Sequence, residues 1–177
     1  MKSNRLPAYL IASIALILNG CSNYSFSGAS INYTETKTLS ITNFFNDSPG
    51  GLPNMGQLFT EELKEYYQRN TKLELVKANG DLQFEGAIVD YQVRPQAIVS
   101  SGDRNQADQS GLMRVTIFVE VGYVNKAKEI DNFKRRFSFF ADYDPQSTTL
   151  NAVEARLVEE IFNQIIFDIF QASVAQW

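Results

Sequence analysis

The C-terminal stretch of the chain has the strongest pattern in the sequence, with an apolar residue at every third or fourth position from Leu150 to Val174. This spacing is typical of an amphipathic helix with one buried face. About 25 helical residues extend over roughly 37 Å. We therefore expect one long helix that crosses a whole small sheet. Its apolar stripe consists of Leu150, Val153, Leu157, Val158, Ile161, Phe162, Ile165, Ile166, Ile169 and Phe170.

Alternating apolar and polar residues predict the strands of that sheet. The pattern is found in residues 37–44, 82–93, 112–124 and 133–142, with a short additional run at 73–77. Val115, Ile117, Val119, Val121 and Tyr123 share one face of their strand. Asn79-Gly80 predicts a hairpin turn between the short run and the strand that follows it.

A second amphipathic helix is predicted from Asn54 to about Asn70, with Asn54 as its N-cap and Gln57 as the capping-box partner. The resulting order is strand, helix, several strands and a final long helix. We therefore predict an α+β fold, a two-layer sandwich with a four-stranded, mostly antiparallel sheet and two helices packed on one face. The domain is expected to span residues 36–177, with polar loops at 46–53 and 98–111.

The first twenty residues have the features of a lipoprotein signal peptide. Lys2 and Arg5 precede a run of thirteen uncharged residues, Leu6 to Leu18, which is too short to span a bilayer. The run ends in Leu-Asn-Gly-Cys, so Cys21 is the predicted site of lipid attachment, and residues 21–35 are the predicted tether. No acidic residue follows Cys21 directly, which favours the outer membrane. The alternative is a plain secretory signal with an incidental free cysteine.

Composition excludes several classes of protein. The 177 residues contain no histidine and one cysteine, which excludes Ser-His and Cys-His catalysis and an intrachain disulfide. The net charge of −4 argues against a nucleic-acid partner. No phosphate-binding loop, nucleophile elbow or metal-ligand spacing is present. We therefore predict that the protein is not an enzyme and that it needs no metal or cofactor.

Lys134, Arg135 and Arg136 form the one conspicuous basic cluster. Arginine suits bidentate phosphate contact, so the cluster is a candidate site for an anionic head group, with Arg94, Arg104 and Arg114 as candidate neighbours. The alternative is that these charges protect an edge strand from aggregation. The acidic residues Asp81, Glu85 and Asp90 are interpreted as solvated strand charges, and Asp103 and Asp108 as part of a loop.

Several segments together resemble the LptE family of lipopolysaccharide-assembly lipoproteins. They are LNGC at 18–21, YSFSGASI at 24–31, LFTEELKEYY at 58–67, GDLQFEGAIVDYQV at 80–93 and IFDIFQASVAQW at 166–177. The resemblance implies an outer-membrane lipoprotein that plugs the β-barrel LptD and assists it in placing lipopolysaccharide at the cell surface. It implies direct lipopolysaccharide binding and no enzymatic step. No motif of the family assigns lipid contacts, so Lys134, Arg135 and Arg136 are candidate phosphate contacts on charge alone.

Two other functions remain open from the sequence. The domain could be a lipoprotein adaptor or pilot for another envelope complex, such as a secretin. A periplasmic hydrolase would require a nucleophile and a base that the sequence does not supply, or a pocket with paired carboxylates.

Overall fold

The structure is a computed structural model, and it describes residues 31–96 and 111–174. The predicted signal peptide, Cys21, most of the predicted tether and the acidic residues Asp103 and Asp108 lie outside these ranges. The elements in chain order are β1 (Thr38–Ile41), β2 (Phe45–Asn46), α2 (Met55–Asn70), β3 (Glu74–Leu75), β4 (Leu82–Pro95), β5 (Met113–Asn125), the short 3-10 helix η1 (Glu129–Asp131), β6 (Phe133–Tyr143) and α3 (Leu150–Val174).

The strands form one mixed sheet in the order β3-β1-β4-β5-β6, and β2 pairs with β4 beyond the end of β1. The long strands β4, β5 and β6 pair antiparallel, as predicted. The short strands β1, β2 and β3 join by parallel pairings. The prediction of four strands was therefore wrong, since the sheet contains six strands within the described residues.

The hairpin predicted at Asn79-Gly80 does not form, because β3 and β4 are separated in the sheet by β1. Asn79 does adopt the left-handed conformation that such a turn requires, with φ +58°. The chain then passes close to β1, where a Cβ on Gly80 would lie 2.5 Å from the backbone nitrogen of Ser40. The prediction of a turn was therefore correct, but after the turn the chain crosses β1 instead of forming a hairpin.

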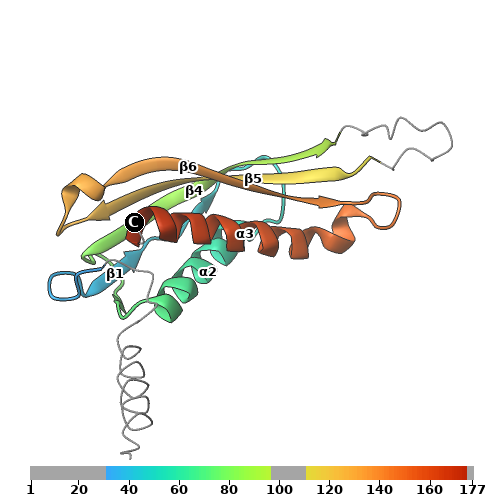
Figure 1. The fold of residues 1–177 in the computed structure, drawn as a ribbon. Coiled ribbons are helices and arrows are strands. Elements are labelled where there is room, and N and C mark those ends of the chain that lie inside the picture. Colours follow the sequence, from blue (N-terminus) through green and yellow to red (C-terminus); the bar gives the residue numbers. More distant parts are fainter. Residues whose placement is uncertain (1–30, 97–110, 175–177) are drawn as a thin grey trace, which may run out of the picture.

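Both helices pack on the same face of the sheet, which confirms the α+β class (Figure 1). In α3 the predicted stripe is buried from Leu157 to Val174, and its bounds agree with the prediction. Aromatic contacts join the two helices, since the ring centroids of Phe59 on α2 and Phe162 on α3 lie 5.0 Å apart. They also join α2 to the sheet, since those of Tyr67 on α2 and Phe84 on β4 lie 5.1 Å apart. The core therefore lies between the two helices and the inward-facing residues of β4, β5 and β6.

Strand β5 is the central element of the long meander. Its five predicted inward residues are 0–1% exposed, so the alternation of the sequence is confirmed. Its register with β4 shifts between Ile88 and Asp90, where a bulge inserts Val89. After the bulge Tyr91 faces the helices, and its hydroxyl donates to Glu154 of α3 at 2.7 Å.

The N-terminus of α2 differs from its prediction. Asn54 occupies the cap position but makes no side-chain capping bond. The Gln57 amide donates instead to Glu61 at 2.9 Å, one helical turn further on. The predicted capping box is therefore wrong. The backbone N–H of Phe44 donates to Thr60 Oγ1 at 2.9 Å, which fixes α2 against the segment between β1 and β2.

No helix in the described part of the chain is both long enough and apolar enough to cross a membrane.

Candidate functional site

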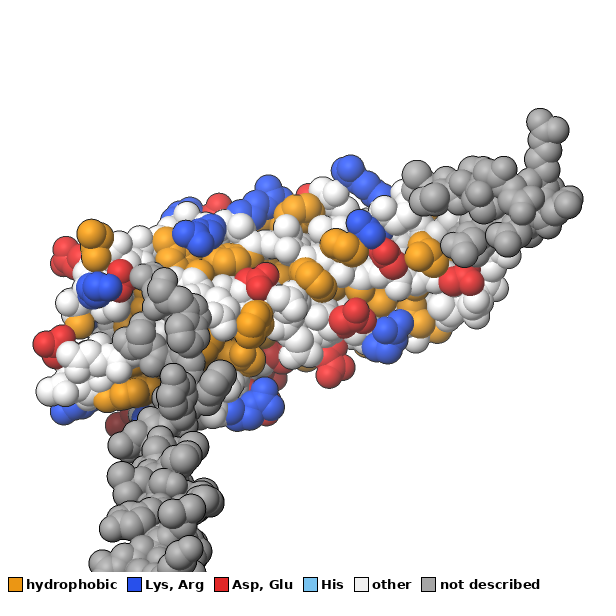
Figure 2. All heavy atoms as spheres, viewed as in Figure 1, with side chains coloured by type: hydrophobic (Ala, Val, Ile, Leu, Met, Phe, Trp, Pro, Cys, Tyr) orange, Lys and Arg blue, Asp and Glu red, His pale blue; other side chains and the backbone are white. Residues whose placement is uncertain are grey.

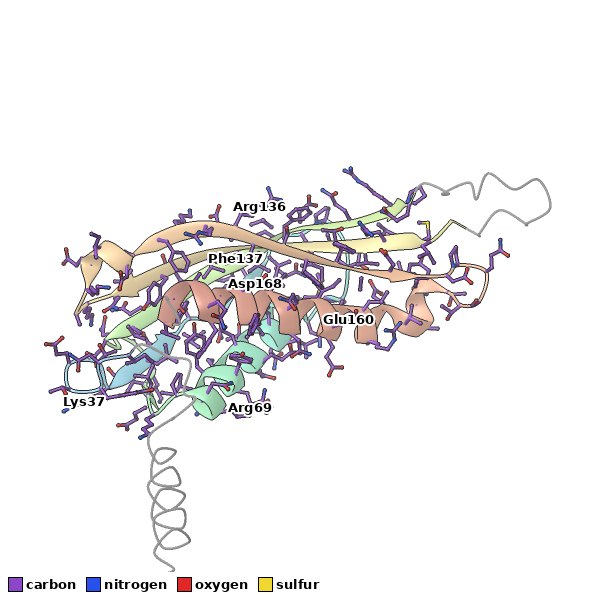
Figure 3. The ribbon with its side chains drawn as sticks, viewed as in Figure 1. Lys37, Arg69, Arg136, Phe137, Glu160 and Asp168 are labelled. Atoms are coloured by element: carbon purple, nitrogen blue, oxygen red, sulfur yellow. The ribbon has the colours of Figure 1, made fainter. Side chains whose placement is uncertain are left out.

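The face of the sheet opposite the helices is not covered by any described helix, and it carries two of the three candidate basic residues. Successive side chains of a strand alternate between faces, so Lys134 and Arg136 point to this open face and Arg135 points to the helix side. Figure 3 shows the alternation directly, with Arg136 pointing away from α3 and Phe137 pointing toward it. The three cations therefore share a strand but do not form a single cluster.

Lys134 is paired across the strands with a carboxylate. Its Nζ lies 2.7 Å from Oε1 of Glu120 on β5. The hydrogen bond and the charge of Glu120 raise the pKa of the Lys134 ammonium above its ordinary value, and Glu85 contributes a further attraction. Both side chains of the pair are largely exposed, so the bond is open to exchange with another anion.

Arg136 lies over an aromatic ring on the same face. Its guanidinium carbon is 4.4 Å from the centroid of the Phe118 ring, and Nη2 is 3.8 Å from Oδ2 of Asp90 on β4. Asp90 also accepts a hydrogen bond from Gln92 at 2.5 Å. The guanidinium lies over the ring, so a cation–π contact supplements the weak ion pair.

Arg114 on β5 repeats this arrangement further along the same face, level with Asp142 of β6, and more tightly. Its Nε and Nη2 each lie 2.8 Å from an oxygen of Asp142, a bidentate pair, and its guanidinium carbon is 3.5 Å from the centroid of Phe140. The bond to Asp142 raises the pKa of the Arg114 guanidinium. The Cα partner of Arg114 on β4 is Arg94, so two arginines lie side by side at this end of the face.

The open face as a whole is balanced in charge. The alternation of the three long strands places four basic and four acidic side chains on it: Arg94, Arg114, Lys134, Arg136, Glu85, Asp90, Glu120 and Asp142. The aromatic side chains Phe118 and Phe140 lie between them. The sequence indicated the cations, but the carboxylates and rings that hold them come from other strands and carry no local signal.

Arg135 has a different environment. Its guanidinium carbon lies 5.2 Å and 6.0 Å from the ring centroids of Phe133 and Phe137, on the helix side of β6. No carboxylate of the described residues lies within ion-pair distance of it. Arg135 is exposed, so it presents its positive charge at the margin of the sheet.

Asp81, interpreted from the sequence as a solvated strand charge, is a local structural group. Its Oδ2 accepts hydrogen bonds from the backbone nitrogens of Lys37 and Thr38, each at 2.9 Å, and from the Thr38 hydroxyl at 2.8 Å. These bonds lower the pKa of the Asp81 carboxyl. The residue fixes the start of β1 to the start of β4.

An acidic groove between α2 and α3 was missed by the sequence analysis. Burial, followed by the charges of Glu159 and Glu65, raises the pKa of the Glu62 carboxyl to about 7. Its buried Oε2 has no hydrogen-bond partner among the described residues. Glu62 and Glu159 lie far apart in the sequence and meet only through helix packing. No group of acidic residues in the described ranges is arranged to hold a metal ion.

The model of the LptE family, described as lipopolysaccharide-assembly, matches residues 36–173. No curated protein matches the sequence.

Two solved structures with TM-scores above 0.5 share the fold at low sequence identity. A neuraminyllactose-binding hemagglutinin homologue from Helicobacter pylori aligns with a TM-score of 0.51 and 9% identity, over 84% of this chain and 88% of that chain. A protein from Xanthomonas campestris aligns with a TM-score of 0.51 and 12% identity, over 80% and 83%. A minor lipoprotein from Acinetobacter baumannii has a TM-score of 0.45 and 17% identity, over 77% and 92%. The family match covers most of the chain, and the chain therefore belongs to the LptE family of lipopolysaccharide-assembly proteins.

Proposed function

We propose that this protein is an outer-membrane lipoprotein, attached through a lipid on Cys21, that plugs the β-barrel LptD and assists it in lipopolysaccharide transport and assembly. The observation that carries the proposal is the open face of the sheet, with its four cations and four carboxylates. A wide transmembrane barrel has a polar, water-filled interior. A polar face of balanced charge fits such an interior without burying an unpaired ion.

We further propose that Lys134, Arg135 and Arg136 contact phosphate groups of lipopolysaccharide. Lys134 and Arg136 lie on one face and are held by exposed ion pairs to Glu120 and Asp90. A phosphate would take the place of these carboxylates and offers more acceptor oxygens to each cation. Arg135 would meet a phosphate from the other side of the same strand.

The experiment for the plug is a mild-detergent purification of the tagged, membrane-anchored protein, followed by mass spectrometry. Recovery of one large outer-membrane β-barrel at about equal stoichiometry supports the proposal. Recovery of a secretin would support the adaptor or pilot function instead. Recovery of neither, with the tagged protein intact, would refute the plug. Cys21→Ser in the same experiment tests the anchor, because it should release the protein from the membrane fraction.

The experiment for lipopolysaccharide contact compares charge reversals at two places on the molecule. Arg135→Glu with Arg136→Glu should weaken binding of purified lipopolysaccharide while the circular dichroism spectrum stays unchanged. Arg69→Glu with Arg156→Glu is the matched control, because it reverses the same number of charges at helix residues whose side chains are 64% and 62% exposed. Figure 3 shows Arg69 on α2, away from β6. Equal loss in both variants would indicate an effect of net charge alone, and no loss in either would remove the proposed contacts.

A further inference from the structure

Strand β6 ends the sheet, and no described strand pairs with its outer edge. It is eleven residues long, and most of its first half is exposed. A free edge of this length presents a row of unpaired backbone donors and acceptors, which is a template for pairing with another strand. The direction of the backbone groups and the side chains of β6 together indicate which strand would fit.

The hydrogen-bond pattern of the meander determines which residues of β6 point outward. The backbone nitrogen of Gln96 donates to the oxygen of Leu112, and that of Lys126 donates to the oxygen of Asp81. Even-numbered residues of β5 therefore bond to β4, and odd-numbered residues bond to β6. In the register of β5 with β6, odd residues lie opposite odd residues, so the backbone N–H and C=O groups of the odd residues of β6 bond to β5. The outward groups belong to Lys134, Arg136, Ser138, Phe140 and Asp142.

The side chains of these same five residues lie on the open face, and their order is self-complementary. An antiparallel pairing of two β6 strands about Ser138 places Lys134 of one copy opposite Asp142 of the other. It also places Arg136 opposite Phe140. Every outward hydrogen-bonding group then meets its counterpart, and each cation meets a carboxylate or an aromatic ring. A parallel pairing in register would instead stack like charges on one another.

A band of apolar side chains accompanies the edge on its helix side. Phe133, Phe137 and Phe139 are buried or half-buried between β6 and α3, and Phe167 of α3 is 43% exposed. Figure 2 shows hydrophobic side chains gathered along this side of the molecule, with basic and acidic groups around them. Figure 3 places Glu160 and Asp168 along α3 below β6. A two-fold axis perpendicular to the sheet would bring the apolar bands of the two copies together. It would also place Arg135 on the same side of the sheet as the acidic residues of α3 in the second copy.

We propose that the edge of β6 binds a second copy of this chain, antiparallel and centred on Ser138, to form a two-fold symmetric dimer with one continuous sheet. Such an interface is isologous, since the same patch serves on both copies. The dimer would use Lys134 and Arg136, so it and the proposed lipopolysaccharide contact would exclude one another. The inference rests on the backbone edge and the side chains of β6, does not require the proposed function, and concerns copies of the chain that are not inside a barrel.

The test is a disulfide cross-link at the symmetry axis. In a hydrogen-bonded antiparallel pair the Cα atoms lie about 5.5 Å apart, within the range that a disulfide spans. The protein carrying Ser138→Cys, extracted in mild detergent and oxidised, should run at twice the mass of one processed chain and return to the mass of one chain on reduction. Thr116→Cys is the matched control, because it places a cysteine on the same face of the internal strand β5. The unsubstituted chain controls for Cys21.

A second variant tests the backbone pairing without a cross-link. Ser138→Pro removes an outward donor that β5 does not use, so the fold should persist while the dimer is lost. The molar mass of the protein in detergent, separated from any barrel partner, should fall from two chains to one. A single-chain mass for the unsubstituted protein at all concentrations, together with no cross-link at Ser138→Cys, would overturn the proposal. That result would favour charge protection of the edge. Equal cross-linking at Thr116→Cys would also overturn it.

Discussion

Glu62 offers a direct test of how α2 and α3 pack. Its carboxylate lies in the groove between the helices, facing Glu65, Tyr66 and Arg69 from α2 and Glu159 from α3. Burial and the two neighbouring carboxylates raise its pKa from 4.5 to about 7. Ionisation of Glu62 therefore opposes folding, and Glu62→Gln removes that opposition.

The sign and size of the effect follow from the shift in pKa. A group whose pKa is raised on folding contributes stability fully below the unfolded pKa, here 4.5, and loses it as the pH rises through about 7. A rise from 4.5 to about 7 in a fully buried group would correspond to about 3.4 kcal/mol. Glu62 is partly exposed, and solvent screening reduces the expected effect to about 1–2 kcal/mol.

The assay is urea unfolding of the full chain in detergent, followed by circular dichroism at pH 5 and at pH 8. Glu62→Gln should be more stable than the unsubstituted protein by about 1–2 kcal/mol at pH 8 and by much less at pH 5. Glu61→Gln is the control, since Glu61 lies on the exposed face of the same helix. A gain that is equal at both pH values, or a loss at pH 8, would refute the reasoning about the groove.

Three further substitutions test the core. Ser173→Ala leaves the buried hydroxyl of Tyr67 without its 2.6 Å partner and should cost about 1–3 kcal/mol of unfolding free energy; a loss below about 0.5 kcal/mol would contradict this. Ile161→Ala, at a site with 0% exposure, should cost about 2–5 kcal/mol in the same urea assay, and a surface-like effect would show that α3 is loosely packed. Gly86→Ala should lower the thermal midpoint sharply, because the new Cβ would lie 2.1 Å from the oxygen of Glu120; an unchanged midpoint would show that the β4–β5 pairing can open there.

Local periodicity was sufficient to predict the two largest elements of the core. The bounds of α3 and the buried face of β5 agree with the sequence pattern, because in each element the same spacing of apolar residues recurs many times. The α2 helix was also placed within a residue or two. The capping box of α2 was predicted wrongly, because Gln57 could bond either backward to the cap or forward to Glu61, and the sequence does not decide between the two.

Pairing between distant segments was beyond the reach of the sequence. The turn at Asn79 was recognised, yet β1 lies between the two strands that the predicted hairpin would join. The basic run at 134–136 was recognised, yet its division between two faces, and the partners Glu120 and Asp90, followed only from the register of β4, β5 and β6.

The sequence by itself determined which of the long segments are helical or extended and which of their faces are buried, because these depend on the spacing of neighbouring residues. Tertiary structure decided the strand order, the charge balance of the open face and the raised pKa of Glu62. The physical reason is that these properties depend on contacts such as Lys134 with Glu120 and Glu62 with Glu159. Such contacts join residues from separate elements, and only the packing of the whole chain brings them within a few ångströms of one another.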